Sequence, residues 1–229
     1  MNNKQVQEIA KTTMEYAKQN INPGMSLLEV RKMCEDKLIE LGADSFWYYN
    51  IGAFIFNDTD TTTSISGRKY STTNSTIKEN DIITIDLSPQ INKVWGDYAR
   101  TIIIENGKVV QSIDNITNDE WRLGLQMEDT LHSIMSDFVT PNTTFEELFY
   151  YINNYITAHG YVNLDFLGNL GHSIVNRKYK RTYIEKGTKK KLGSVAAFTF
   201  EPHISCKDSK YGFKKENIYY FDNGKLKEL

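Results

Sequence analysis

The feature that most constrains the fold of this chain is a repeat of helix signals at residues 21–47 and 139–165. Each copy contains a turn, a capping box, an amphipathic pattern and a C-terminal glycine. The matched pairs are Pro23 with Pro141, Ser26 with Thr144, Glu29 with Glu147, and Gly42 with Gly160, all at an offset of 118 residues. Because such an offset separates whole supersecondary units, the chain is predicted to fold as two related halves.

The remaining elements follow the same order in each half. A helical pattern precedes each copy, and strand-like runs follow it. The predicted helices are roughly 3–19 and 117–137, and the predicted strands are 46–56, 82–88 and 94–104 in the first half and 194–202 and 214–222 in the second. We therefore expect an α+β fold in a single domain, 1–229, with pseudo-repeats of about 1–112 and 113–229.

Acidic residues interrupt the strand-like runs at corresponding places. Asp86 is the penultimate residue of the apolar run DIITIDL, and Asp97 lies eleven residues later in GDYART. If the halves are equivalent, a second pair of acids should lie near residues 204 and 215, and Glu201 and Glu216 lie close to those positions. Two equivalent hairpins that meet at a pseudo-twofold axis would bring all four carboxylates together.

Four clustered carboxylates indicate a metal site, because they repel one another unless cations neutralise them. The best additional ligand is His172, in the stretch NLGHSIV, which shows no helical periodicity. Two Asp, two Glu and one neutral His carry a charge of -4, which balances two divalent cations. Carboxylates with one imidazole suit Mn, Co, Fe or Zn. The predicted ligands are Asp86, Asp97, His172, Glu201 and Glu216.

The order IDL, GDYART, GHSI, EPH and a final strand glutamate resembles the pita-bread metallopeptidases, which include methionine aminopeptidase, aminopeptidase P and prolidase, with creatinase as a metal-free relative. The resemblance covers almost the whole chain. It implies an internally duplicated pita-bread fold with antiparallel sheets around a dinuclear site. It also implies that Asp97 and Glu216 bridge the two ions, whereas Asp86, His172 and Glu201 complete the ligand set.

The resemblance implies a hydrolase that cleaves N-terminal peptide bonds with a metal-bridged hydroxide, on a peptide substrate with a free N-terminus. Glu201 would move the proton of the attacking water. The motifs GDYART and EPH favour an Xaa-Pro aminopeptidase or dipeptidase over the methionine type.

The chain departs from the family at its substrate-facing histidines. The segment TTTSISGRKYSTTNST contains none, and the expected place beyond the ligand histidine holds Tyr179. We expect Arg68, Tyr179 or His203 to replace them. The departure leaves an alternative open, in which the chain hydrolyses another C–N bond or serves as a binding scaffold.

Composition excludes some classes of partner. With 27 basic and 29 acidic residues, the net charge of -2 gives no general attraction to nucleic acid or membrane. The basic, tyrosine-containing segment 177–191 is typical of an RNA contact, but its Gly187 and alternating pattern favour a solvated hairpin. No stretch approaches the roughly 20 apolar residues of a membrane span, and we expect a cytoplasmic protein. The sequence leaves the oligomeric state open.

Overall fold

The computed structural model describes residues 2–229, apart from the side chain of Lys178, and it confirms the expected α+β class. Met1, at which the predicted domain begins, lies outside the described residues. The predicted domain and pseudo-repeat boundaries stay predictions. In the described part of the chain, no helix has the length and apolar character that a bilayer crossing requires.

The helices form two pairs, one in each half of the chain. The first pair is α1 (Asn3–Asn20) and α2 (Leu27–Glu40), and the second is α3 (Asp119–Phe138) and α4 (Phe145–Ala158). Both predicted capping boxes form. The backbone N–H of Ser26 donates to the Glu29 carboxylate at 2.7 Å, and that of Thr144 donates to Glu147 at the same distance. These reciprocal bonds satisfy N–H groups that would otherwise lack partners in the first helical turn.

Between the helix pairs lies an antiparallel sheet whose strands run in the order β2, β3, β6, β11, β10, β8. Its strands are β2 (Ala53–Asn57), β3 (Asp81–Leu87), β6 (Tyr98–Glu105), β7 (Lys108–Val109), β8 (Tyr161–Asn163), β9 (Phe198–Phe200), β10 (His203–Cys206), β11 (Phe213–Asp222) and β12 (Lys225–Glu228). A smaller sheet contains β1 (Ser45–Phe46), β4 (Pro89–Ile91) and β5 (Val94–Trp95). Short 3-10 helices occupy Asp58–Thr62, Ile113–Asn115, Phe166–Gly168, Lys178–Lys180 and Leu192–Ser194.

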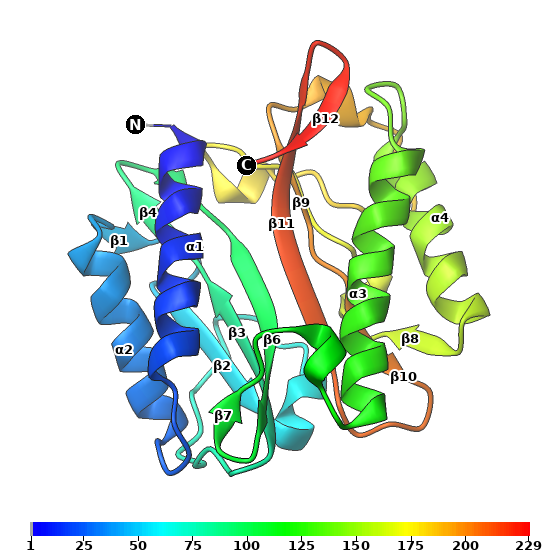
Figure 1. Ribbon diagram of the computed structural model, residues 1–229. Coiled ribbons are helices and arrows are strands. Elements are labelled where there is room, and N and C mark those ends of the chain that lie inside the picture. Colours follow the sequence, from blue (N-terminus) through cyan, green and yellow to red (C-terminus); the bar gives the residue numbers. More distant parts are fainter. Residues whose placement is uncertain (1) are drawn as a thin grey trace.

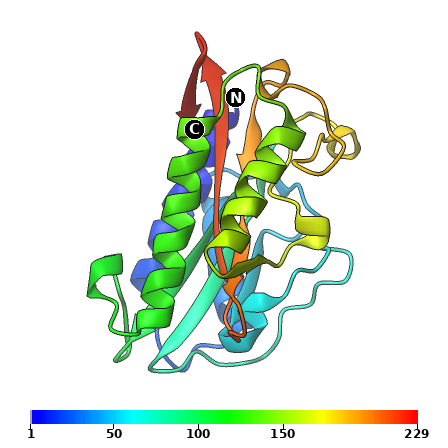
Figure 2. The ribbon, with the colours of Figure 1, turned by 90° about the vertical axis from the view of Figure 1, so that its right-hand side faces the viewer.

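Each helix pair covers the strands of its own half (Figure 1). Along β3, Ile83, Ile85 and Leu87 pack into the core with α1 and α2, whereas the alternate residues Thr84 and Asp86 line a cavity. This alternation is the period of two that a strand imposes. The second view shows α3 and α4 in front of β11 in the same way (Figure 2). Strand β3 thus presents apolar side chains to the helices and polar ones to the cavity.

The two halves join where β6 pairs with β11, and this pairing sets the position of the acids. Ala99 of β6 lies opposite Asp86 of β3 on one side and Glu216 of β11 on the other. Directly paired residues of an antiparallel sheet point to the same face. Because the side chain between them is a single methyl group, the carboxylates of Asp86 and Glu216 can approach each other over Ala99.

Three of the predicted segments differ from the structure. The run 46–56 is not one strand, because Tyr49 and Asn50 adopt left-handed conformations that separate β1 from β2. The run 94–104 is divided into β5 and β6. Within the run 194–202 the strand β9 ends at Phe200, directly before Glu201.

The hairpin expected at 177–191 is also wrong. Its residues bridge to other segments, since Tyr183, near the middle, bridges to His172 and Lys191, at the end, bridges to Thr144. The segment therefore forms a wall over the His172 loop, with a 3-10 turn at Lys178–Lys180.

Candidate metal centre

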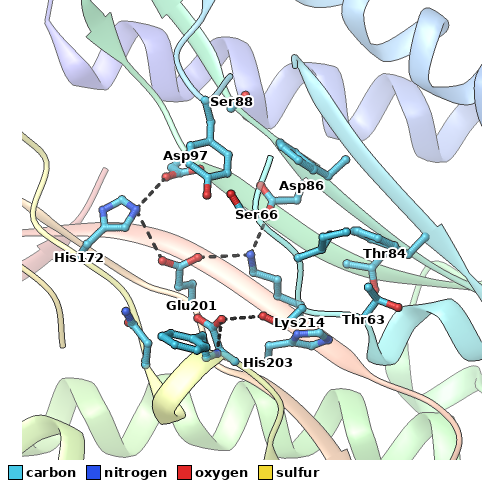
Figure 3. A pocket seen from close by; sticks show the side chains of 18 of the residues that line it. Thr63, Ser66, Thr84, Asp86, Ser88, Asp97, His172, Glu201, His203 and Lys214 are labelled. Carbon is cyan, nitrogen blue, oxygen red and sulfur yellow. Dashed lines mark hydrogen bonds and ion pairs between the residues drawn. The ribbon is translucent and has the colours of Figure 1, made fainter. Parts of the chain in front are cut away.

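The polar face of the sheet lines a cavity of about 820 Å³ (Figure 3). Residues from both halves of the chain contribute to its walls, including Thr84, Asp86 and Asp97 from the first half and Glu201 and Lys214 from the second. The sheet register thus brings together acids that are more than one hundred residues apart in the sequence.

Three carboxylates form the centre of the site. One oxygen from each of Asp86, Asp97 and Glu216 lies within 4.8 Å of the others. Glu216 is fully buried at 0% exposure, and neither of its carboxylate oxygens has a hydrogen-bond partner among the described residues. A buried carboxylate that accepts no hydrogen bond is costly, and a cation bound beside it would offset that cost.

His172 and Glu201 extend this cluster. The Nε2 atom of His172 lies 3.7 Å from Asp97 Oδ2 and 3.7 Å from Glu201 Oε1. This spacing is too long for a hydrogen bond, but it is close to the separation of two ligand atoms that each lie about 2.1 Å from one shared ion. Figure 3 shows the imidazole pointing between the two carboxylates.

The main chain fixes the position of His172. Its N–H donates to Thr199 Oγ1 at 2.9 Å, and its carbonyl accepts from the N–H of Thr199 at 2.7 Å. Gly171 adopts φ +133°, and a Cβ there would lie 2.3 Å from the Thr199 carbonyl oxygen. Only glycine allows the loop to approach β9 this closely.

Lys214 is a member of the site that the sequence reading missed. Its Nζ lies 2.6 Å from Asp86 Oδ2, 3.2 Å from Glu201 Oε2 and 3.8 Å from Glu216 Oε2. The signal was present, because Lys214 lies two residues before Glu216 on the same strand and must share its face. A lysine on the polar face of a strand is usually expected to point into solvent. Here the polar face of the strand lines the cavity.

Burial and neighbouring charges shift the pKa values of the ionisable groups in this site. Burial raises the pKa of Asp97 well above its usual range, and the neighbouring charges of Asp86 and Glu201 raise it further. Burial likewise raises the pKa of Glu216, with Asp97 and Glu201 adding to it. Burial would lower the pKa of Lys214, but the surrounding carboxylates outweigh it, so that pKa stands well above its ordinary value.

The donor set fits divalent cations. It offers four carboxylates and a buried imidazole whose pKa is held well below 6.5, by burial first and then by the charge of Arg181. A neutral imidazole is the form that binds a metal, and hard carboxylate oxygens with one nitrogen suit first-row divalent ions. The structure brings all five predicted ligands together, and their ligand role stays a prediction.

The predicted substrate residues lie in different surroundings. His203 lines the cavity, and its Nε2 donates to the Thr61 carbonyl at 2.7 Å. Tyr179 is 75% exposed, and neither it nor Arg68 belongs to the described lining. Ser66 and Lys69 line the cavity from the segment that contains Arg68.

Part of the cavity wall is cationic and aromatic, although the sequence pattern favoured a core strand for the aromatic residues of 46–56. The Arg181 guanidinium lies 5.1 Å from the ring centre of Trp47, 5.6 Å from that of Tyr48 and 5.2 Å from that of Tyr183. These distances allow cation–π attraction. The residues come from separate loops, so no sequence spacing could have predicted their meeting.

Comparison with known proteins finds metallopeptidases. Residues 2–223 match a family model described as metallopeptidase family M24. A methionine aminopeptidase of Helicobacter pylori is 27% identical over 213 residues, which cover 87% of this chain and 77% of that protein.

Solved structures share the fold. X-Pro aminopeptidase from Thermotoga maritima has a TM-score of 0.79 at 16% identity, and the match covers 98% of this chain and 58% of that one. Prolidase from Pyrococcus furiosus has a TM-score of 0.78 at 19% identity, covering 98% and 61%. The chain thus spans less than two thirds of each of those proteins. The likeness confirms the expected pita-bread fold.

Proposed function

The chain belongs to metallopeptidase family M24, and we propose that it is a metal-dependent hydrolase that cleaves the N-terminal bond of peptides. The observation that carries the proposal is the convergence of five potential ligands at one cavity. Asp86, Asp97, His172 and Glu201 line it, and the buried Glu216 has an oxygen within 4.8 Å of Asp86 and Asp97.

We infer that the site holds two divalent ions, of the group Mn, Co, Fe and Zn. The four carboxylates carry a charge of -4, which two such ions would neutralise. Ions bound there would act as Lewis acids that activate a water molecule and a peptide carbonyl.

Glu201 is the residue best placed to move a proton. Its carboxylate is at the cavity wall, where Oε1 accepts a hydrogen bond from Thr199 Oγ1 at 3.2 Å and Oε2 lies 3.2 Å from Lys214 Nζ. These two contacts fix the orientation of the carboxylate. Glu201 can therefore take a proton from the attacking water and deliver it to the leaving amine.

The proposed ions also account for the choice of the N-terminal bond. The free amino group of a peptide, in its neutral form, would lie beside ions held by Asp86 and Asp97, which lie in the cavity lining. The rest of a short peptide would extend toward His203 and toward the wall that contains Arg181 and Tyr183. Cleavage would then occur at the first peptide bond.

For side-chain preference we favour the Xaa-Pro type, on the motifs GDYART and EPH. The methionine type is the second candidate, because the sequence relative from Helicobacter pylori is a methionine aminopeptidase. The two types differ in the peptides that they cleave, so a peptide panel separates them.

The test is hydrolysis of Met-Xaa and Xaa-Pro peptides by the protein loaded with Mn²⁺ or Co²⁺. We expect metal-dependent release of the N-terminal residue from the Xaa-Pro set and its loss in Asp97→Ala and Glu201→Ala. The matched control is Asp129→Ala, which removes a surface partner of Lys215 and should retain activity. Cleavage of the methionine set alone would select the second candidate, and no cleavage of either set would refute the proposal.

A further inference from the structure

Lys214 brings a positive charge into the group of predicted metal ligands. Its ammonium contacts three of the four acids, at 2.6 Å from Asp86, 3.2 Å from Glu201 and 3.8 Å from Glu216. Its side chain is only 16% exposed, so water screens these interactions weakly. In the structure, the lysine therefore neutralises part of the charge that a cation would otherwise balance.

The ammonium and the imidazole approach the cluster from different sides, and each faces a different oxygen of Glu201. Nζ of Lys214 donates a hydrogen bond to Asp86 Oδ2, whereas His172 approaches the cluster beside Asp97 and Glu201 (Figure 3). The site thus has an Asp86 side, where an ammonium is already present, and a His172 side, where a neutral imidazole is present.

This asymmetry is built into the repeat. Lys214 lies two residues before Glu216, and the residue two before Asp97 in the first half is Trp95. The indole of Trp95 packs in an apolar cluster, with its ring centre 5.7 Å from that of His172. One half therefore places an aromatic ring next to the site and the other half places a cation, so the two sides are not electrostatically equivalent.

The charge balance predicts that the two sides differ in their affinity for a divalent ion. In the ionised form that metal ligands take, four carboxylates and one ammonium sum to -3, and one divalent ion reduces that to -1. A second divalent ion would bring the sum to +1 and would have to approach the ammonium closely. Repulsion between like charges in a buried site is strong because little solvent screens it.

We propose that Lys214 is an internal cation of the metal centre, so that an ion on the His172 side binds tightly and an ion on the Asp86 side must first displace the ammonium. This inference rests on the proposed metal dependence. The lysine has a flexible four-carbon stem and lines the cavity, so it can move away from Asp86 when an ion arrives.

The neighbouring lysine provides a matched control. Lys215 lies on the opposite face of the same strand, where its Nζ pairs with Asp129 of α3 at 2.6 Å. Replacing Lys214 or Lys215 by Met removes the same charge from adjacent positions. Only the first replacement changes the metal centre.

The experiment is equilibrium dialysis of the metal-free chain against increasing Mn²⁺, with bound metal measured by elemental analysis. For the wild type and Lys215→Met we expect a first ion that binds at least tenfold more tightly than the second. In Lys214→Met the second ion should bind about 10- to 100-fold more tightly, because the charged hydrogen bond to Asp86 no longer has to be broken.

Thermal melting provides a second readout that does not depend on activity. Without metal, Lys214→Met should melt below Lys215→Met, since Asp86 loses its counter-ion, and saturating Mn²⁺ should close the gap. Lys214→Gln, which can still donate a hydrogen bond to Asp86, serves if the Met variant does not fold. Lys214→Gln should also raise the affinity for the second ion.

Three outcomes would overturn the proposal: two ions of equal affinity in the wild type, an unchanged affinity for the second ion in both Lys214 variants, or no bound Mn²⁺. The proposed function fails on a different observation. If binding is stepwise as expected and yet no peptide is cleaved, the internal cation stands and the peptidase does not. If the protein cleaves peptides but binds two ions with equal affinity, the peptidase stands and the internal cation does not.

Discussion

Gln7 holds the main chain of Asp97 with two hydrogen bonds. Its Nε2 donates to the Asp97 carbonyl at 2.7 Å, and its Oε1 accepts from the Asp97 N–H at 2.9 Å. Gln7 is fully buried on α1, and Asp97 lies in the gap between β5 and β6, where the sheet does not satisfy its backbone. A helix side chain thus replaces the missing strand partner and fixes the position of a predicted bridging ligand.

Gln7→Leu should therefore destabilise the protein and weaken metal binding. The substitution leaves a buried N–H and a buried carbonyl without partners, which costs about 2–4 kcal/mol together. Urea unfolding followed by tryptophan fluorescence would measure the loss. Gln111→Leu, on an exposed side chain, is the control and should change the free energy of unfolding little. Equal stability of the two variants would show that water replaces Gln7.

Gly171→Ala should displace His172. The new Cβ would lie 2.3 Å from the Thr199 carbonyl oxygen, in a backbone conformation with φ +133° that also disfavours alanine. We expect a lower melting temperature and a weaker response to Mn²⁺. Gly224→Ala has φ +81° with no atom within 4 Å, so it incurs only the backbone cost of about 1–2 kcal/mol. A Gly171→Ala variant that binds Mn²⁺ as the wild type does would contradict this account of the loop.

The sequence predicted the elements whose signals are local. The helix starts at Ser26 and Thr144 were predicted correctly because a capping box involves residues three positions apart. The run 46–56 was misread because its aromatic residues satisfy a strand pattern, while Trp47 and Tyr48 line the cavity instead. Periodicity cannot distinguish a buried strand from a wall of a pocket.

The site was predictable to the extent that the repeat determined it. The repeat located the acid pairs because each half carries them at corresponding positions. Lys214 is missing from the prediction because its equivalent in the first half is Trp95, so it follows no repeat. Gln7 and Arg181 reach the site from a helix and a loop, and only the tertiary structure brings them there.

The wild type should lose stability in acid through His203. Burial, followed by the charge of Lys214, lowers its pKa to about 4 from 6.5, so between these values the unfolded chain binds a proton that the folded chain does not. Stability from this residue is present above pH 6.5 and decreases as pH falls, by about 3 kcal/mol at pH 4.

The measurement is urea unfolding of the metal-free wild type and His203→Gln between pH 6.5 and pH 4. The amide nitrogen of Gln can take the place of Nε2 and donate to the Thr61 carbonyl, which accepts at 2.7 Å in the wild type, but the amide does not titrate. The wild type should lose about 3 kcal/mol more than the variant over this range. Parallel pH profiles would indicate that His203 is protonated in the folded state.

Glu216→Gln should stabilise the metal-free protein and abolish most of its stabilisation by metal. The buried carboxylate has no hydrogen-bond partner among the described residues, and burial followed by the charges of Asp97 and Glu201 raises its pKa well above 4.5. The folded chain therefore binds a proton more readily than the unfolded chain. Stability of the metal-free wild type should decrease as pH rises above 4.5, and the amide removes that loss.

Melting with EDTA and with Mn²⁺, at pH 5 and pH 7, separates these effects. A free ion concentration of 100 times the dissociation constant stabilises a binding protein by about 2.7 kcal/mol, which the wild type should show and Glu216→Gln should not. Without metal, the advantage of the variant should be larger at pH 7 than at pH 5, because the free energy needed to bury the wild-type carboxyl increases as the pH rises above 4.5, where the unfolded chain releases that proton. Glu40→Gln, on an exposed side chain of α2, should match the wild type throughout. A metal-free Glu216→Gln protein that melts below the wild type at pH 7 would mean that Lys214, 3.8 Å from Glu216, already compensates the carboxylate, because the substitution would then break a favourable ion pair.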